Sequence, residues 1–233
     1  METGEPHRPV LYQEIIQYLA PFSPGRYLDC TAGAGGHSKG ILEASAPDGQ
    51  LVALDLDPDA VALARATLAP FGSRAIVIHA SYTESAQVLA EIGWQKVDGI
   101  VLDLGVSSMQ LDQAERGFSF QQNGPLDMRF DPTRGPSAAD LVNNLDEKAL
   151  ADLIWRYGEE RYSRRIARAI VQARPLQTTQ ELASVVRSAI GKTSERQDPA
   201  TRTFQALRIA VNDELKNIQE ALPQLIELLE SNA

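Results

Sequence analysis

Residues 26–37 read RYLDCTAGAGGH, and this stretch decides the fold. A short apolar run of strand length passes directly into a loop that contains Gly33, Gly35 and Gly36. Glycines let the backbone turn sharply and approach a ligand closely, and the first turn of a helix behind such a loop offers free N–H groups. A strand, a glycine loop and a helix in this order are typical of the ligand-binding edge of a Rossmann-like sheet.

Three more apolar runs of strand length follow, and helical patterns separate them. These predicted strands cover residues 51–57, 75–81 and 97–105. Residues 58–69 predict a helix with Asp57 as its N-cap and Pro58 at its first position. Its apolar face is formed by Val61, Ala64 and Leu68. Because continuous apolar strands joined by helices form parallel sheets covered on both faces, the first half predicts an α/β fold with a doubly wound parallel sheet.

From about Met109 onward the strand signal stops, and a loop-rich stretch leads into helical patterns. We predict helices over 146–154, 159–172 and 178–190, and one long helix after Pro199 that Pro223 interrupts. Thr178 and Glu181 have the spacing of a capping box, and Gly191 predicts the end of that helix. The second half therefore predicts a helical module.

The composition is that of an ordinary soluble protein: 233 residues, of which 43% are hydrophobic and 23% charged. The single cysteine, Cys30, excludes a disulfide framework and a cysteine-cluster zinc site, and we expect it in the core. The N-terminus lacks the apolar core of a secretory signal, and no stretch approaches the roughly 18 to 20 apolar residues of a membrane span. We therefore expect a cytoplasmic protein with no membrane partner and no metal site.

The net charge of −9 argues at first against a nucleic-acid partner, because phosphate binding depends on Lys and Arg. The charge is not uniform, however. Residues 151–210 hold ten Arg and one Lys against six acidic residues, a local net charge of +5, so the rest of the chain carries −14. Arginine suits contacts to phosphates and base edges. Pairing along helix faces, as the spacing of Glu159 and Glu160 with Arg164 allows, is the alternative that stays open.

An acid follows the glycine loop at the spacing of a nucleoside-binding site. Asp55 comes 22 residues after Gly33, at the end of the second predicted strand, where a carboxylate can hold the two ribose hydroxyls of an adenosine. A dinucleotide fingerprint would place a third glycine at position 38, where Ser38 stands. Asp29 at the start of the loop suits an ammonium and a sulfonium better than a pyrophosphate. These residues favour S-adenosylmethionine over a dinucleotide, and a tight turn without a ligand is the third interpretation.

Several longer motifs carry a resemblance to a known family. In order along the chain they are HRPVL (7–11), DCTAGAGGH (29–37), DLGVSSMQLD (103–112), ERGFSF (115–120), PLDMRF (125–130), YGEERYSRRIARAI (157–170) and PATRTFQALRIAVNDEL (199–215). Over essentially the whole chain this pattern resembles the 16S rRNA cytosine N4-methyltransferase family. The resemblance implies methyl transfer from S-adenosylmethionine to the exocyclic N4 of one cytosine in the decoding centre of the small ribosomal subunit.

The resemblance also assigns residues to roles. It implies cofactor contacts at Gly35, Gly36, His37, Asp55, Tyr82, Asp103 and Gln110. Because the N4 lone pair is delocalised into the ring, the reaction needs acceptors for the amino protons, for which Asp103, Ser107 and Ser108 are the catalytic candidates. Asp103 keeps both roles, and a turn that caps the following segment is the alternative for the two serines.

RNA contacts fall on the basic segment and on two aromatic residues. The candidate RNA-binding residues are Arg164, Arg165 and Arg168. Phe118 and Phe120 are candidates for stacking on the flipped base, and a small apolar core under a long loop is their alternative role. The expected partner is 16S rRNA in the small ribosomal subunit, and a homodimer stays open.

The family pattern implies a Rossmann-like class I methyltransferase domain with a helical domain inserted after its fourth strand. We place the cofactor-binding domain at 1–108 and 209–233 and the inserted RNA recognition domain at 109–208. Tyr82, Met109 and Phe130 stand where the family usually has Phe, Pro and Met. The family's later strands, with an ISFHSLEDR motif, are not in this sequence. We therefore expect a fragment or a shortened paralogue, and a catalytically incomplete cofactor- or RNA-binding protein is the alternative function.

Overall fold

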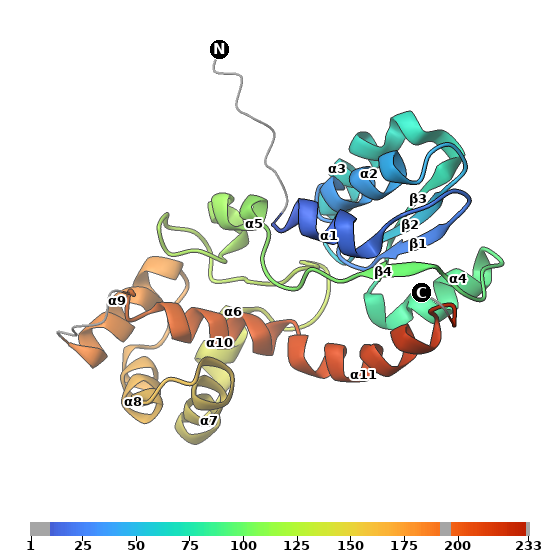
Figure 1. The fold of residues 1–233 in the computed structure, drawn as a ribbon. Helices are drawn as coiled ribbons and strands as arrows, with labels where there is room; N and C mark the ends of the chain where they lie inside the picture. The colour runs from blue at the N-terminus through green and yellow to red at the C-terminus, as the bar shows by residue number, and fades with distance from the viewer. Residues whose placement is uncertain (1–9, 192–196, 232–233) are drawn as a thin grey trace, which may run out of the picture. The chain divides into compact units, whose positions relative to one another are not determined.

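The computed structural model describes residues 10–191 and 197–231 of the chain (Figure 1). The chain divides into two compact units. Unit 1 comprises residues 1–105 and 217–233, and unit 2 comprises Val106–Lys216. Our expected boundary between residues 208 and 209 falls inside a helix, Thr201–Val211, that belongs entirely to unit 2.

Unit 1 is built on a parallel sheet of the four predicted strands. These are β1 (Arg26–Asp29), β2 (Gln50–Asp55), β3 (Ala75–His79) and β4 (Gly99–Val101), in the order β3-β2-β1-β4. Leu28 in β1 pairs with Val52 on one side and with Ile100 on the other. The α/β prediction with a doubly wound parallel sheet is confirmed.

Helices cover both faces of this sheet, as Figure 1 shows. One face carries α1 (Tyr12–Leu19), α2 (Gly36–Ala44) and α3 (Pro58–Leu68), and the other carries α4 (Ser85–Glu91) and residues 217–227 of α11 (Glu214–Glu227). Short 3₁₀ helices, η1 (Ala69–Arg74) and η2 (Tyr82–Glu84), flank β3. Asp57 caps α3 as predicted, since its side chain accepts the Asp59 N–H at 3.0 Å. The predicted face of α3 is buried: Val61, Ala64 and Leu68.

The strand order creates a switch point between β1 and β4. From β1 the chain adds β2 and β3 on one side, and then it returns through α4 to place β4 on the other side of β1. Open α/β sheets bind ligands beyond the carboxyl ends of their strands at such a point. Cys30, directly after β1, is buried as expected, and burial raises the pKa of its thiol to about 12.

Unit 2 is helical and has one apolar core of its own. Its elements are α5 (Ser108–Asp112), η3 (Ala114–Arg116), α6 (Ala138–Asn144), α7 (Glu147–Gly158), α8 (Ser163–Ala173), α9 (Thr179–Ile190) and α10 (Thr201–Val211). The start of α9 is the predicted capping box of Thr178 and Glu181, and Gly191 ends it with a φ of 79°. Among the described residues of the chain, no helix is long and apolar enough to cross a membrane.

Two helix predictions were wrong. The helix expected from residue 159 begins at Ser163, because Glu159 adopts a φ of 50° and ends α7. The long helix expected after Pro199 is divided in two, because Asp213 has a φ of 50° between α10 and α11. Pro223 lies inside α11 without ending it. The backbone carbonyl that Pro223 leaves unpaired belongs to the exposed Gln219, where water can bind it.

Candidate functional site

The carboxyl edge of the sheet in unit 1 gathers the predicted cofactor-binding residues of that unit. The glycine loop with His37 follows β1, and Asp55 is the last residue of β2. Tyr82 opens η2 shortly after β3, and Asp103 comes two residues after β4. In a parallel sheet these strand ends lie at one edge.

Asp55 is hydrogen-bonded to the glycine loop. Its Oδ2 accepts the Gly33 N–H at 2.8 Å, and its Oδ1 accepts the Asp57 N–H at 2.9 Å. Each carboxylate oxygen can accept a second bond, so both keep capacity for a ligand hydroxyl. The pKa of this carboxyl is raised, and burial is the main cause.

The glycines of the loop have different tasks. Gly35 has a φ of 84°, and a Cβ there would lie 3.3 Å from the Ala64 Cα, so this glycine lets the loop approach α3. Gly33 has a φ of 52°, but a Cβ there would meet no atom within 4 Å. The backbone at Gly33 therefore borders open space, into which a ligand can fit.

The side chain of Asp29, the last residue of β1, connects this strand to the glycine loop and to α2. Its buried carboxylate accepts the Ser38 hydroxyl at 2.6 Å and the Thr31 N–H at 3.1 Å. The Thr31 hydroxyl in turn accepts the Asp103 N–H at 2.7 Å, which ties the end of β4 to the loop. Sequence reasoning missed Thr31, and it treated Ser38 only as a missing glycine.

The buried carboxyl of Asp29 also affects stability. Burial raises its pKa, so the folded protein binds this proton more tightly than the unfolded chain does. The ionised carboxylate therefore lowers stability at neutral pH, and this loss disappears as the pH falls through the raised pKa.

His37, at the start of α2, has two ring nitrogens without a partner. The residue is 5% exposed, and neither nitrogen has a hydrogen bond within the described part of the chain. Its Nε2 lies 3.6 Å from Asp103 Oδ2, which is too long for a hydrogen bond. Tyr12 stacks on the imidazole with ring centroids 6.3 Å apart. Since buried polar atoms are normally bonded, these nitrogens are suited to a ligand.

Sequence reasoning missed the contact of Tyr12 with His37, for which the only signal was the position of Tyr12 directly after HRPVL. Residues 7–9 of that motif lie outside the described residues. Tyr82 has its backbone fixed by the capping box of Ser81 and Glu84. Its partly buried ring packs against the apolar cluster on the α4 side of the sheet.

Ser107, Ser108 and Gln110 belong to unit 2, on and beside α5, and are described there by themselves. Ser107 caps this helix, because its hydroxyl accepts the Gln110 N–H at 3.2 Å. Gln110 Oε1 accepts the Ser107 N–H at 3.0 Å in return. These two hydrogen bonds support the capping role of Ser107. They also engage the side chain of Gln110.

The two phenylalanines of the loop-rich stretch pack inside unit 2. Phe118 is buried and stacks on Phe130 with centroids 5.5 Å apart. Phe120 meets Phe204 edge to face at 4.7 Å. This packing favours the small apolar core over base stacking.

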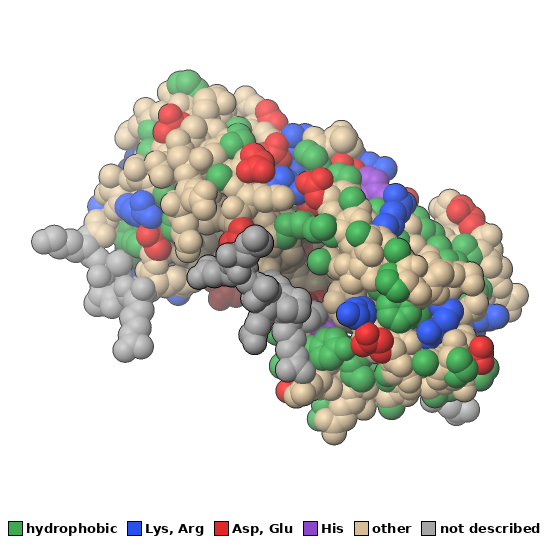
Figure 2. Space-filling model, turned by 90° about the horizontal axis from the view of Figure 1, so that it is seen from above, with side chains coloured by type: hydrophobic (Ala, Val, Ile, Leu, Met, Phe, Trp, Pro, Cys, Tyr) green, Lys and Arg blue, Asp and Glu red, His purple; other side chains and the backbone are tan. Residues whose placement is uncertain are grey.

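The predicted RNA-binding arginines lie on α8, and all three are exposed. Arg168 Nε is 3.4 Å from Glu147 Oε1, whereas Arg164 and Arg165 have no ion pair within the described ranges. On the face shown in Figure 2, Lys and Arg side chains lie among Asp and Glu side chains, so the residues drawn in colour form no single-sign field there. Lys192 and Arg196 lie outside the described residues.

Comparison with known proteins identifies the family. The model of the MraW methylase family matches residues 4–233. A protein of Dehalococcoides mccartyi named "Ribosomal RNA small subunit methyltransferase H" is 54% identical over 227 residues, which are 97% of this chain and 65% of that protein. A protein of the same name from Geobacter sp. (strain M21) is 54% identical over 228 residues, 96% of this chain and 73% of that protein.

The chain thus spans slightly under two thirds of the length of the Dehalococcoides relative. A solved structure of a putative rRNA-methylase from Clostridium thermocellum shows 15% identity and a TM-score of 0.36, covering 45% of this chain and 58% of that one. At this low score the assignment depends on the sequence match alone. Because that match extends through nearly the whole chain, the chain belongs to the MraW methylase family.

Proposed function

We propose that this chain belongs to an S-adenosylmethionine-dependent methyltransferase that methylates N4 of a specific cytosine of 16S rRNA in the small ribosomal subunit. We place the reaction in the cytoplasm. The observation that carries the proposal is the edge of the sheet in unit 1. There Asp55, bonded to the glycine loop, accompanies the buried His37, whose ring nitrogens lie near Asp103 and make no hydrogen bond within the described residues.

The residues at this edge fit the cofactor. Gly33 borders open space, Asp55 has capacity for two ribose hydroxyls, and the His37 ring nitrogens make no hydrogen bond within residues 10–191 and 197–231. The residues that would hold the cofactor are Gly35, Gly36, His37, Asp55, Tyr82 and Asp103, together with Gln110 from unit 2. Carboxylates at three strand ends suit a positively charged ligand and disfavour a pyrophosphate. S-adenosylmethionine supplies an electrophilic methyl group when bound.

We propose that Asp103 accepts a proton from the amino group of the cytosine. Its carboxylate is exposed, while its backbone is fixed through the hydroxyl of Thr31. An acceptor at this place withdraws the amino proton as the nitrogen forms its new bond to carbon. Ser107 and Ser108 would orient the base. In this proposal the domain expected at 1–108 and 209–233 binds the cofactor and the one expected at 109–208 recognises the RNA, with the boundaries moved to those of units 1 and 2.

Methyl transfer to unmodified subunits tests the proposal directly. We expect the protein with labelled S-adenosylmethionine to label a single cytosine of 16S rRNA, and Asp103→Asn to lower the rate about 100-fold. Mass spectrometry of rRNA fragments locates the methyl group. Cofactor binding without transfer would favour the catalytically incomplete protein, and binding of NAD in preference to S-adenosylmethionine would contradict the proposal.

Asp55→Asn tests the cofactor site. Replacing the carboxylate by an amide leaves poorer acceptors for the ribose hydroxyls, so we expect S-adenosylmethionine to bind at least about tenfold more weakly in calorimetry. Because burial raises the pKa of Asp55, the affinity of the unmodified chain falls as the pH is lowered, beginning above the range of an ordinary aspartate. Asp48→Asn, in an exposed loop of unit 1, is the matched control. Equal affinity of both variants at all pH values would exclude Asp55 from the site.

The arginines of α8 are tested by the salt dependence of RNA binding. Each phosphate contact contributes about one unit to the slope of log affinity against log salt concentration, so joint Arg164→Gln and Arg165→Gln should lower the slope by about two. Arg168→Gln should have less effect, since Glu147 already pairs with this residue. Lys148→Gln, which breaks an exposed pair with Asp152, is the control. An unchanged slope in the double variant would remove α8 from the interface.

A further inference from the structure

The loop between η3 and α6 in unit 2 contains a strained residue in its middle. Met128 has a φ of 64° and is fully buried. A residue with a Cβ adopts this conformation at a cost in energy, and it persists only where the surroundings enforce it. Such positions tend to occur where a structure must present a group in a defined way.

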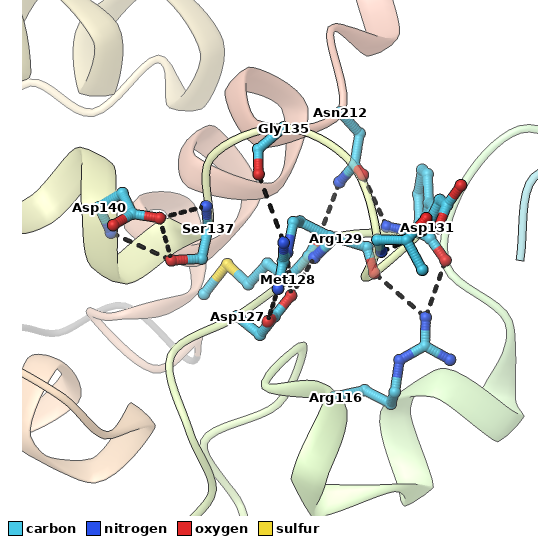
Figure 3. A network of polar contacts seen from close by, with 11 residues as sticks. Arg116, Asp127, Met128, Arg129, Asp131, Gly135, Ser137, Asp140 and Asn212 are labelled. Carbon is cyan, nitrogen blue, oxygen red and sulfur yellow. Dashed lines mark hydrogen bonds and ion pairs between the residues drawn. The ribbon is translucent and has the colours of Figure 1, made fainter.

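Two side chains from outside the loop hold the backbone from Met128 to Phe130, as Figure 3 shows. Asn212, at the end of α10, donates its Nδ2 to the Met128 carbonyl and accepts the Phe130 N–H at Oδ1, both at 2.7 Å. The buried Arg116 donates its Nη2 to the carbonyls of Arg129 at 3.1 Å and Phe130 at 2.9 Å. We call these two residues the clamp.

A second set of bonds braces the rest of the loop. Arg129 forms a two-pronged pair with Asp127 at 2.9 and 2.7 Å, and its Nη1 donates to the Gly135 carbonyl at 3.3 Å. The Asp127 carbonyl accepts the Ala138 N–H at 2.7 Å, at the start of α6. The loop is therefore tied to the helical core at both of its ends.

The braced loop presents one arginine. Asp131 is 4% exposed, and its Oδ1 accepts the Thr133 N–H at 2.9 Å and the Thr133 hydroxyl at 2.6 Å. Its Oδ2 lies 3.3 Å from Nε of Arg134, whose side chain is 69% exposed. The two terminal nitrogens of Arg134 have no partner within the described ranges. The Asp131 carboxylate thus pairs with the Nε side of the guanidinium at ion-pair distance, and the two terminal nitrogens stay open to a ligand.

We propose that Arg134 binds a phosphate of the substrate RNA through these two terminal nitrogens. A guanidinium pairs with phosphate through two parallel hydrogen bonds, which a lysine cannot reproduce. Bracing the loop in advance, with Nε of Arg134 paired to Asp131, reduces the entropy lost on binding. This inference rests on the proposed function, because it takes the RNA substrate from there. It adds a contact outside the basic helix α8.

Binding of unmodified small ribosomal subunits over a range of salt concentrations tests the proposal. We expect Arg134→Gln to weaken binding about tenfold and to lower the salt slope by about one. Arg134→Lys should keep the slope and still bind more weakly than the unmodified chain, because it retains the charge but loses the fork. The control is Arg65→Gln on α3 of unit 1, an exposed arginine with one backbone acceptor at 3.2 Å.

An Arg134→Gln variant with the affinity and slope of the unmodified chain would overturn the proposal while leaving the proposed function intact. Failure of the unmodified chain itself to bind subunits would overturn both.

Asn212→Asp tests whether the clamp positions Arg134. The substitution keeps the acceptor for Phe130 and removes the donor to Met128. We expect the tenfold effect of Arg134→Gln to shrink in this background, while the affinity for S-adenosylmethionine stays unchanged. Full additivity of the two substitutions would overturn the role of the clamp. If Asn212→Asp does not fold, the exposed Arg134 variants still decide the phosphate contact.

Discussion

The buried carboxylate of Asp29 is the constraint on which the candidate site depends. It bonds the hydroxyl of Ser38 in α2 and the N–H of Thr31 in the loop, and Thr31 passes the constraint to Asp103 at the end of β4. Asp29 therefore connects the end of β1 to α2 directly and to the end of β4 through Thr31. Burial raises the pKa of Asp29, so the ionised group lowers stability at neutral pH. The presence of Asp29 at this position is therefore better explained by its positioning of the glycine loop and Asp103 than by a contribution to stability.

At this fixed edge, the groups that would bind a ligand keep free hydrogen-bonding capacity. His37 has no hydrogen-bonding partner for its ring within the described residues, and Asp55 retains acceptor capacity although it already binds the glycine loop. Preorganised groups of this kind lose little entropy when a ligand arrives. In unit 2, Asn212 and Arg116 hold the strained backbone of residues 128–130, and Arg134 follows four residues later. We therefore propose that hydrogen bonds inside each unit position its exposed functional side chains, Asp103 in unit 1 and Arg134 in unit 2.

The features that could be predicted from the sequence are those set by residues close together in the chain. The strands, the Asp57 cap, the capping box of α9 and the place of Asp55 follow from local patterns, and the structure has them. The contacts of Thr31 and Asn212 join residues 72 and 82 positions apart, so no local pattern could reveal them. The break between α10 and α11 was missed because Asp213 adopts a left-handed conformation that apolar periodicity does not signal. The tasks of Ser107 and Gln110 could be predicted only as alternatives, because capping and catalysis use the same residue types.

Hydrogen exchange of the loop amides in the free protein measures whether Asp29 and Asp55 hold this edge before a ligand binds. We expect the N–H groups of Thr31 and Gly33 to be protected without any ligand, because the carboxylates of Asp29 and Asp55 accept them. We also expect Asp29→Ala to remove the protection at Thr31 while the amides of β2 stay protected. Exchange of both amides at the rate of an unstructured loop in the unmodified chain would show instead that the ligand, and not Asp29, forms the edge.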